Sequence, residues 1–280
     1  MKGETKMRYR SRSFIAVLAV LYILVLSSAA QAQDSPFNIE NMPNVVGFSV
    51  GILPDYVGSN DYMVGGAPFF RITYPQSQYY ARLLATDLQV NVINHPVFRL
   101  GPAVNYRFGR NDDVEDNVVK HMKEIDDTIE AGAFAGIELV DSSDPRQRFL
   151  ASVEVLSDVG SEYNGYNFSL SASYWMPVSK PVDIMIGGGI TWADDNYMGT
   201  YFGVDQEDAA RTGLPVYEAD GGFLMARVNA GAVLHLSMSW HVAAGVQYRP
   251  LLNQATDSPI VKDCGSPDQF IAGLGVAYSW

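Results

Sequence analysis

Cysteine is almost absent from this chain. Cys264 is the single cysteine in 280 residues, so no disulfide can form within the chain. This excludes the small secreted domains that depend on disulfides. We interpret Cys264 as a free thiol in a surface loop. Stability must therefore come from buried apolar surface or from contact with lipid.

Positive charge is scarce after residue 32. The first 32 residues hold five of the 19 Lys and Arg residues and one of the 31 Asp and Glu residues. The remainder has 19 − 5 = 14 bases and 31 − 1 = 30 acids, a net charge of −16. Such a chain does not attract nucleic acid or anionic lipid through its bulk charge. We expect no nucleic-acid partner.

Long apolar runs are missing except near the amino terminus. A basic segment with Lys2 and Lys6 precedes the apolar run 14–26, and Ala30-Gln31-Ala32 offers a small-x-small cleavage site. This pattern predicts a secretory signal peptide over residues 1–32, cut after Ala32. The alternative is an amino-terminal membrane anchor, but the run is short for a span of about 20 residues. No cysteine marks a lipoprotein cleavage site.

Residues 33–280 contain no linker, low-complexity segment or flexible hinge, which predicts a single domain after an irregular lead-in at 33–44. The closing stretch, 270–280, alternates apolar or aromatic residues with small ones and ends on Trp280. Side chains of a strand alternate between two faces, so this stretch has one apolar face and one slim face. It is typical of the last strand of an outer-membrane barrel, although a soluble sandwich also alternates.

The same alternation recurs along the chain. We expect strands at 46–52, 67–74, 79–93, 98–108, 129–139, 149–155, 166–176, 182–192, 224–236, 242–248 and 270–280. Segment 79–93 is one long strand or two short ones bent at Thr86-Asp87. Charged residues such as Glu130, Arg227 and Arg249 alternate with uniformly apolar faces, which favours a wet lumen and a lipid-facing hull.

Short and long connections also alternate. The short ones are 75–78, 141–147, 177–181 and 237–239, and the long ones are 109–127, 157–165, 193–221 and 251–268. Outer-membrane barrels place short turns in the periplasm and long loops outside. Bending 79–93 puts every long loop outside and predicts twelve strands in an all-β, antiparallel, up-and-down transmembrane barrel; ten strands is the alternative.

Five motifs in order resemble the MltA-interacting protein (MipA/OmpV) family: PDYVGSNDY at 54–62, YRFGRNDD at 106–113, TWADDNYMGTYFGV at 191–204, the stretch 213–222 with Tyr217, and DSPIV at 257–261. The resemblance spans almost the whole chain after the leader. It implies an outer-membrane barrel, and in one branch a scaffold that joins a murein synthase to a lytic transglycosylase. Other members are discussed as adhesins or in antibiotic and osmotic responses.

Reactive constellations are few. Among the four histidines, His235 and His241 are expected to face the lumen, where an interior hydrogen-bond network is the ordinary role. Ser258 lacks a Gly-x-Ser-x-Gly elbow. Gly187-Gly188-Gly189 lies within a strand and is not a phosphate loop. We assign no catalytic, cofactor-binding or metal-ligating residue and expect no cofactor.

Charged residues occur as acidic pairs in the connections and as single residues at inward strand positions. Asp112-Asp113, Asp126-Asp127 and Asp194-Asp195 could ligate calcium through oxygen donors, but they lack EF-hand spacing and are read as solvated loops. The charges expected to face inward mix both signs, which predicts a salt-bridged interior that narrows or blocks the lumen. They are Arg71, Arg82, Arg107, Glu130, Glu138, Glu154, Asp183, Arg227 and Arg249.

These observations predict a non-enzymatic protein of the Gram-negative outer membrane, in contact with its lipid. The role that the resemblance implies is a scaffold that links this membrane to murein-remodelling enzymes, with a murein synthase and a lytic transglycosylase as partners. A small-solute channel or a surface adhesin is the alternative, and a barrel hydrolase is a third hypothesis.

Overall fold

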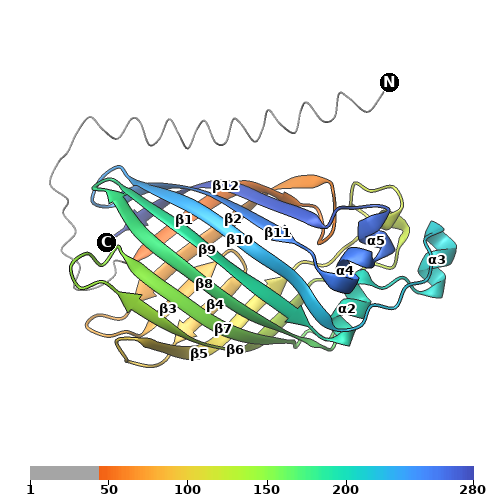
Figure 1. Ribbon diagram of the computed structural model, residues 1–280, viewed down its shortest axis with the longest axis horizontal. Helices are drawn as coiled ribbons and strands as arrows, with labels where there is room; N and C mark the ends of the chain where they lie inside the picture. Colours follow the sequence, from red (N-terminus) through yellow and green to blue (C-terminus); the bar gives the residue numbers. More distant parts are fainter. Residues whose placement is uncertain (1–43) are drawn as a thin grey trace, which may run out of the picture.

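The computed structural model describes residues 44–280, so the expected leader, 1–32, and the lead-in up to residue 43 lie outside the described part. Twelve antiparallel strands pair each with its neighbours in the sequence. β1 also pairs with β12 from Val45↔Ser279 to Ile52↔Ala272, which closes the cylinder (Figure 1). The prediction of a twelve-strand barrel is confirmed, and the alternative of ten strands is wrong.

Side chains of the strands alternate between the inner and outer faces, with register shifts at Phe223/Met225 and Pro177/Ser179. They are β1 (Val45–Pro54), β2 (Tyr62–Thr73), β3 (Tyr80–Leu84), β4 (Asp87–Asn91), β5 (Phe98–Arg107), β6 (Thr128–Val140), β7 (Arg148–Asp158), β8 (Tyr166–Ser179), β9 (Val182–Ala193), β10 (Gly222–His235), β11 (Trp240–Pro250) and β12 (Asp268–Ser279). Apolar side chains of the outer face, such as Phe48 and Leu274, are about half exposed because no protein covers them. An exposed apolar hull of this kind matches a lipid-facing surface.

Segment 79–93 forms two short strands, as the bend at Thr86-Asp87 predicted. β3 and β4 have five residues each, whereas the other strands have ten or more. Ala85 turns the chain with a left-handed φ of 55°, and its N–H donates to the carbonyl of Pro68 at 3.0 Å. The two strands pair tightly from Tyr80↔Asn91 to Leu84↔Asp87.

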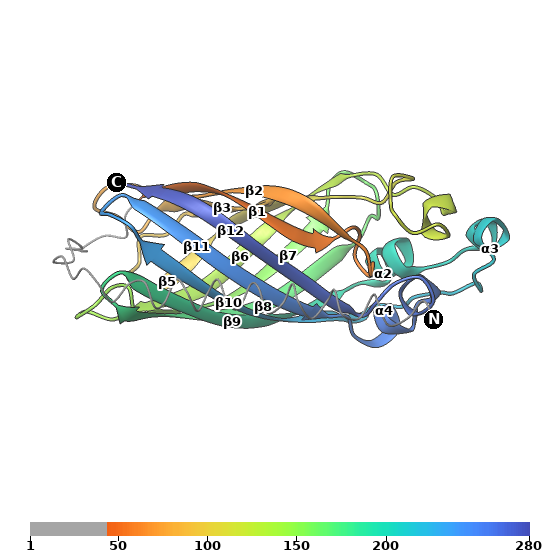
Figure 2. The ribbon, with the colours of Figure 1, turned by 90° about the horizontal axis from the view of Figure 1, so that it is seen from above.

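The two ends of the barrel differ. We call the end with the short connections and Trp280 the turn end, and the opposite end the loop end. Four short α-helices gather at the loop end: α2 (Asp195–Phe202), α3 (Gln206–Thr212), α4 (Asn253–Asp257) and α5 (Pro259–Lys262) (Figures 1 and 2). The sequence predicted long loops over 193–221 and 251–268, and their helices were missed. Within residues 44–280, no helix is long and apolar enough to cross a membrane.

Most of the buried apolar core lies in the loops, and a smaller cluster of Ala103, Phe134 and Leu156 lies in the wall. Buried side chains at the loop end form two clusters, one around α2 and one around α5. Their largest members include Tyr197, Met198 and Phe202, each at most 1% exposed. The loop between β5 and β6 contains the short 3₁₀ helix η2 (Val119–His121). The long loops therefore behave as a folded layer on top of a cylinder.

Candidate functional site

The loops at the loop end pack together into one layer. We call it the loop cap and define it as residues 55–61, 108–127, 159–165, 194–221 and 251–267. Loops from different strands share its two apolar clusters: Tyr56 and Val119 pack in the same cluster as Ile260. Ser258, fully buried, donates from Oγ to the carbonyl of Phe202 at 2.7 Å and so joins the β11–β12 loop to α2.

Acidic residues in the loop cap build its helices. Asp194 is the N-cap of α2 and accepts from the N–H of Tyr197 at 3.0 Å, and Asp205 caps α3 by accepting from Asp208 at 2.7 Å. An N-cap carboxylate satisfies one of the free N–H groups of a helix start. Asp195 accepts from the N–H of Gly221 at 2.6 Å. Asp194-Asp195 is therefore part of the folded cap, whereas the sequence indicated a solvated acidic loop.

Glu130 of β6 forms a hub just below the loop cap. The side chain is completely buried, and it accepts bonds from Nε and Nη2 of Arg107 on β5 at 2.7 and 3.0 Å. It also accepts from Tyr163 Oη at 2.5 Å, from Asn105 Nδ2 at 2.7 Å and from Asn167 Nδ2 at 3.0 Å. A buried carboxylate needs this many donors, because a charge left without partners would be expensive.

Three tyrosines connect that hub to the cap. Tyr163, Tyr197 and Tyr201 lie with ring centroids 4.7 to 5.9 Å apart, and the guanidinium of Arg107 lies 4.9 Å from the ring centroid of Tyr197. Burial, helped by the neighbouring Glu130 carboxylate, raises the pKa of Tyr163 above its ordinary value. Burial also raises the pKa of Tyr201. The phenols stay neutral, and the one at Tyr163 acts as a hydrogen-bond donor to the hub.

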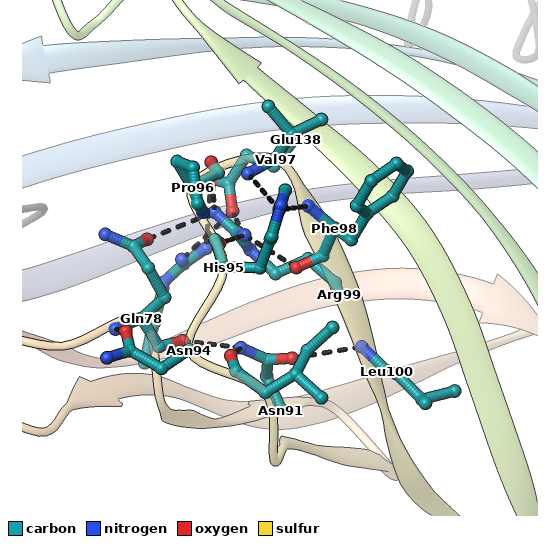
Figure 3. A network of polar contacts seen from close by, with 12 residues as sticks. Gln78, Asn91, Asn94, His95, Pro96, Val97, Phe98, Arg99, Leu100 and Glu138 are labelled. Atoms are coloured by element: carbon teal, nitrogen blue, oxygen red, sulfur yellow. Dashed lines mark hydrogen bonds and ion pairs between the residues drawn. The ribbon is translucent and has the colours of Figure 1, made fainter.

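A second ionic cluster lies inside the barrel near the turn end. Glu138 Oε2 accepts from Arg99 Nε at 3.0 Å and pairs with Arg71 Nη2 at 3.3 Å. Arg99 also donates from Nη1 to the carbonyl of His95 at 2.6 Å, which ties the β4–β5 turn to the lumen (Figure 3). Arg99 and Glu138 are 5% and 2% exposed. Multiple donors make this pair a rigid support for the turn.

A hydrogen-bonded chain joins four neighbouring strands at the turn end. Asp183 Oδ2 lies 2.9 Å from His235 Nε2, His235 Nδ1 lies 2.8 Å from His241 Nδ1, and His241 Nε2 lies 2.7 Å from Ser279 Oγ. Each imidazole nitrogen in this chain can donate or accept a hydrogen bond, and the tautomer of each ring decides which role it takes. Because Ser279 is only 3% exposed, its hydroxyl is shielded from a substrate. The chain links the ends of β9, β10, β11 and β12.

The mixed charges expected inside the barrel do face the lumen, and they separate into two groups. Arg71, Arg107, Glu130, Glu138 and Asp183 take part in ion pairs, which confirms the predicted salt-bridged interior for these positions. Arg82 instead donates to Gln89, whose amide donates to Glu154 at 2.6 Å. Arg227 and Arg249 have no ion pair within residues 44–280.

The glycine run and the single cysteine that the sequence analysis considered both lie in packed surroundings. Gly187 and Gly189 lie in β9, where added Cβ atoms would meet side chains of the lumen at 2.9 and 2.8 Å. Cys264 is a free thiol, but it is buried among Tyr56, Val204 and Ile260, so the expectation of a surface thiol is wrong. Across residues 44–280, no group of three or more His, Cys, Asp or Glu side chains is arranged to hold a metal ion.

Sequence reasoning missed part of the hub. Asn105 and Asn167 occupy inward positions of their strands, so the alternation already marks them as lumenal. Tyr163 and Tyr197 come from loops, where no periodicity indicates which way a side chain points. Their contacts with Glu130 and Arg107 span 33 and 90 residues of sequence. Only the folded loops reveal that they close over the barrel.

Comparisons with known proteins agree with this architecture. A family model described as MltA-interacting protein MipA matches residues 46–280. The outer membrane protein Omp26La of Vibrio anguillarum is 28% identical over 190 residues, which are 67% of this chain and 66%, or just under two thirds, of that protein.

Solved barrels show looser likeness. The NanC porin has a TM-score of 0.48 at 8% identity, with 84% of this chain and 100% of that chain covered. The translocator domain of the autotransporter NalP from Neisseria meningitidis has a TM-score of 0.42 at 10% identity, with coverages of 96% and 98%. The family match over nearly all of the described residues decides the assignment: the chain belongs to the MipA family of outer-membrane β-barrel proteins.

Proposed function

We propose that this protein is a non-enzymatic scaffold that holds murein-remodelling enzymes at the periplasmic face of the outer membrane. The family description names an interaction with MltA, and the resemblance implies a murein synthase and a lytic transglycosylase as partners. The observation that carries the proposal is the packed loop cap at the loop end. A folded cap anchored to Arg107 and Glu130 suits a rigid anchor better than an open conduit.

The turn end is the docking face in this proposal. Short connections face the periplasm in outer-membrane barrels, where murein enzymes work. The ion pairs of Glu138 and the chain from Asp183 to Ser279 hold these connections rigidly, so a partner would lose little entropy in binding them. The turn between β10 and β11 also presents apolar surface, because Leu236 and Met238 are 62% and 63% exposed.

Site-specific crosslinking tests the proposal. A photoreactive amino acid at Met238 samples the turn end, and the same group at Glu207 in α3 samples the loop cap as a matched control. We expect a murein synthase or a lytic transglycosylase to be captured from Met238 and not from Glu207. Capture of neither enzyme at Met238, or equal capture from both positions, would contradict the scaffold role.

A small-solute channel is the second candidate function, because part of the lumen wall carries only small side chains. Inward positions of β11 and β12 carry small residues, among them Ala243, Gly245, Gly273 and Gly275. Planar-bilayer recording separates the two functions. A capped scaffold gives no steady openings, whereas long-lived, ion-selective openings of the wild-type barrel would favour the channel.

A further inference from the structure

Two arginines face each other across neighbouring strands inside the barrel. β10 and β11 pair at Val228↔Tyr248, and the bridge Met225↔Leu251 keeps the same register further along. This register places Arg227 directly opposite Arg249. Both side chains point inward: a Cβ added at the lumenal Gly189 would lie 2.8 Å from Arg227 Nε, and Arg249 pairs with the buried Gln269 of β12.

This pair is uncompensated within the described chain. Neither arginine forms an ion pair in residues 44–280, whereas the lumenal arginines Arg71, Arg99 and Arg107 do. The Nε atom of Arg249 is inaccessible and has no hydrogen-bond partner. Like charges directly opposite each other on paired strands destabilise a sheet. Two guanidinium groups in this arrangement therefore call for a negative charge between them.

The carboxylates that influence Arg227 belong to other strands. Glu154 of β7 and Asp87 of β4 act on it through space, but neither reaches it as an ion-pair partner. Glu154 is already occupied by the amide of Gln89 at 2.6 Å. The side chain of Gln269, beside Arg249, already forms hydrogen bonds with the backbone of Gly58, Ser59 and Ser266 in the cap loops. The surrounding side chains do not supply the missing counter-charge.

The neighbourhood of the two arginines is polar. Gly189 has no side chain, which lets the guanidinium of Arg227 lie close against β9, and the next inward pair towards the turn end is Asn229↔Gln247. Arginine presents a planar fork of N–H donors that matches the oxygens of a carboxylate or phosphate. We propose that Arg227 and Arg249 form a binding site for a small oxyanion, a phosphate or a carboxylate, in the lumen beneath the loop cap.

Calorimetric titration with inorganic phosphate tests this site. The full-length mature barrel is used in nonionic detergent, with ionic strength held constant by a chloride salt. We expect one saturable site, and a loss of affinity of about ten- to a hundredfold in R249Q, because charged hydrogen bonds are removed. R211Q is the matched control, since Arg211 lies in the cap, is 45% exposed and pairs with Asp208. Its affinity should equal that of the wild type.

A stability measurement tests the proposal independently if phosphate binding to the arginine variants is too weak to measure by calorimetry. In phosphate-free, low-salt buffer, R227Q removes the repulsion between the two guanidinium groups and should raise the urea midpoint of unfolding. Phosphate should raise the urea midpoint of the wild type, so the difference in midpoint between R227Q and the wild type should become smaller. R249K, which keeps the charge and loses the fork, should retain part of the phosphate effect.

Three outcomes would overturn the proposal. One is the absence of saturable phosphate and acetate binding to the wild type. Another is unchanged affinity in a folded R227Q/R249Q double variant, with folding verified by heat-dependent mobility on gels. The third is a lower urea midpoint of R227Q in phosphate-free buffer, which would show that the two arginines do not repel each other.

Discussion

Arg107 of β5 donates from Nη1 to Oη of Tyr197 in α2 at 2.9 Å, and this bond ties the barrel wall to the loop cap. The two residues come from separate parts of the barrel rim, because α2 follows β9 and β5 lies four strands away. Glu130 holds the same guanidinium from below. A polar contact thus joins the loop cap at the mouth to the ionic interior of the barrel.

Loss of the Tyr197 hydroxyl should loosen the cap. Y197F removes a hydrogen bond to a charged group, worth about 1.5–3 kcal/mol, while the ring still packs. We expect trypsin to cut the cap, for example after Lys123, about tenfold faster or more, with the barrel still folded. Y74F is the control, because Tyr74 is 70% exposed at the turn end. Equal cleavage of both variants would mean that the bond does not hold the cap.

Loss of the Glu130 carboxylate should lower the free energy of unfolding more than loss of an exposed charge does. E130Q leaves Arg107 buried without its carboxylate, and breaking a buried pair costs about 3–5 kcal/mol. Urea unfolding followed by tryptophan fluorescence measures the loss. R211Q breaks a partly exposed pair and should cost at most about 1 kcal/mol. A similar small effect in E130Q would contradict the role of the hub.

The closing seam depends on a glycine. An added Cβ at Gly51 of β1 would lie 2.4 Å from the carbonyl oxygen of Ala272 in β12, whereas one at Gly245 of β11 would find its nearest atom at 3.7 Å. We expect G51A to reduce the folded, heat-modifiable fraction on gels and G245A to leave it unchanged. Both are inward glycines, so a defect in both variants would indicate loss of chain flexibility and not a clash at the seam.

Cys264 should react slowly in the folded protein. Burial, with the nearby charges of Asp116 and Asp263, raises the pKa of its thiol to about 11 from an ordinary 9.0. The thiolate is the reactive form, so iodoacetamide labelling at pH 8 should be about a hundredfold slower than in the unfolded chain and should accelerate as pH rises towards 11. The folded thiol binds its proton more tightly, so this site favours folding below pH 9 and loses that contribution between pH 9 and 11. Rapid labelling at pH 8 would show an open loop.

The leader should be absent from the protein in the membrane. We expect cleavage after Ala32, which gives a single mature domain, 33–280, that begins with Gln33. Intact-mass measurement of the protein from outer-membrane fractions tests this. A mass that includes residues 1–32 would favour the amino-terminal anchor.

Much of the wall could be predicted from the sequence. The alternation in 166–176 and 270–280 assigns each side chain to the hull or the lumen, and β8 and β12 follow it. The bend at Thr86-Asp87 was found from the order of short and long connections, and β3 and β4 meet there. The cap helices were missed because acidic caps such as Asp194 also occur in plain loops.

The sequence by itself determined which side chains of each strand lie on the apolar face and which lie on the polar face, because a strand places alternate side chains on opposite faces whatever its partner is. It favoured a barrel of twelve strands, and the structure excluded ten. Tertiary structure alone decided that Tyr197 meets Arg107, that Cys264 is buried, and that Arg227 and Arg249 lack a counter-charge. Those facts depend on loop closure and on the register between strands, which bring together atoms that no local pattern relates.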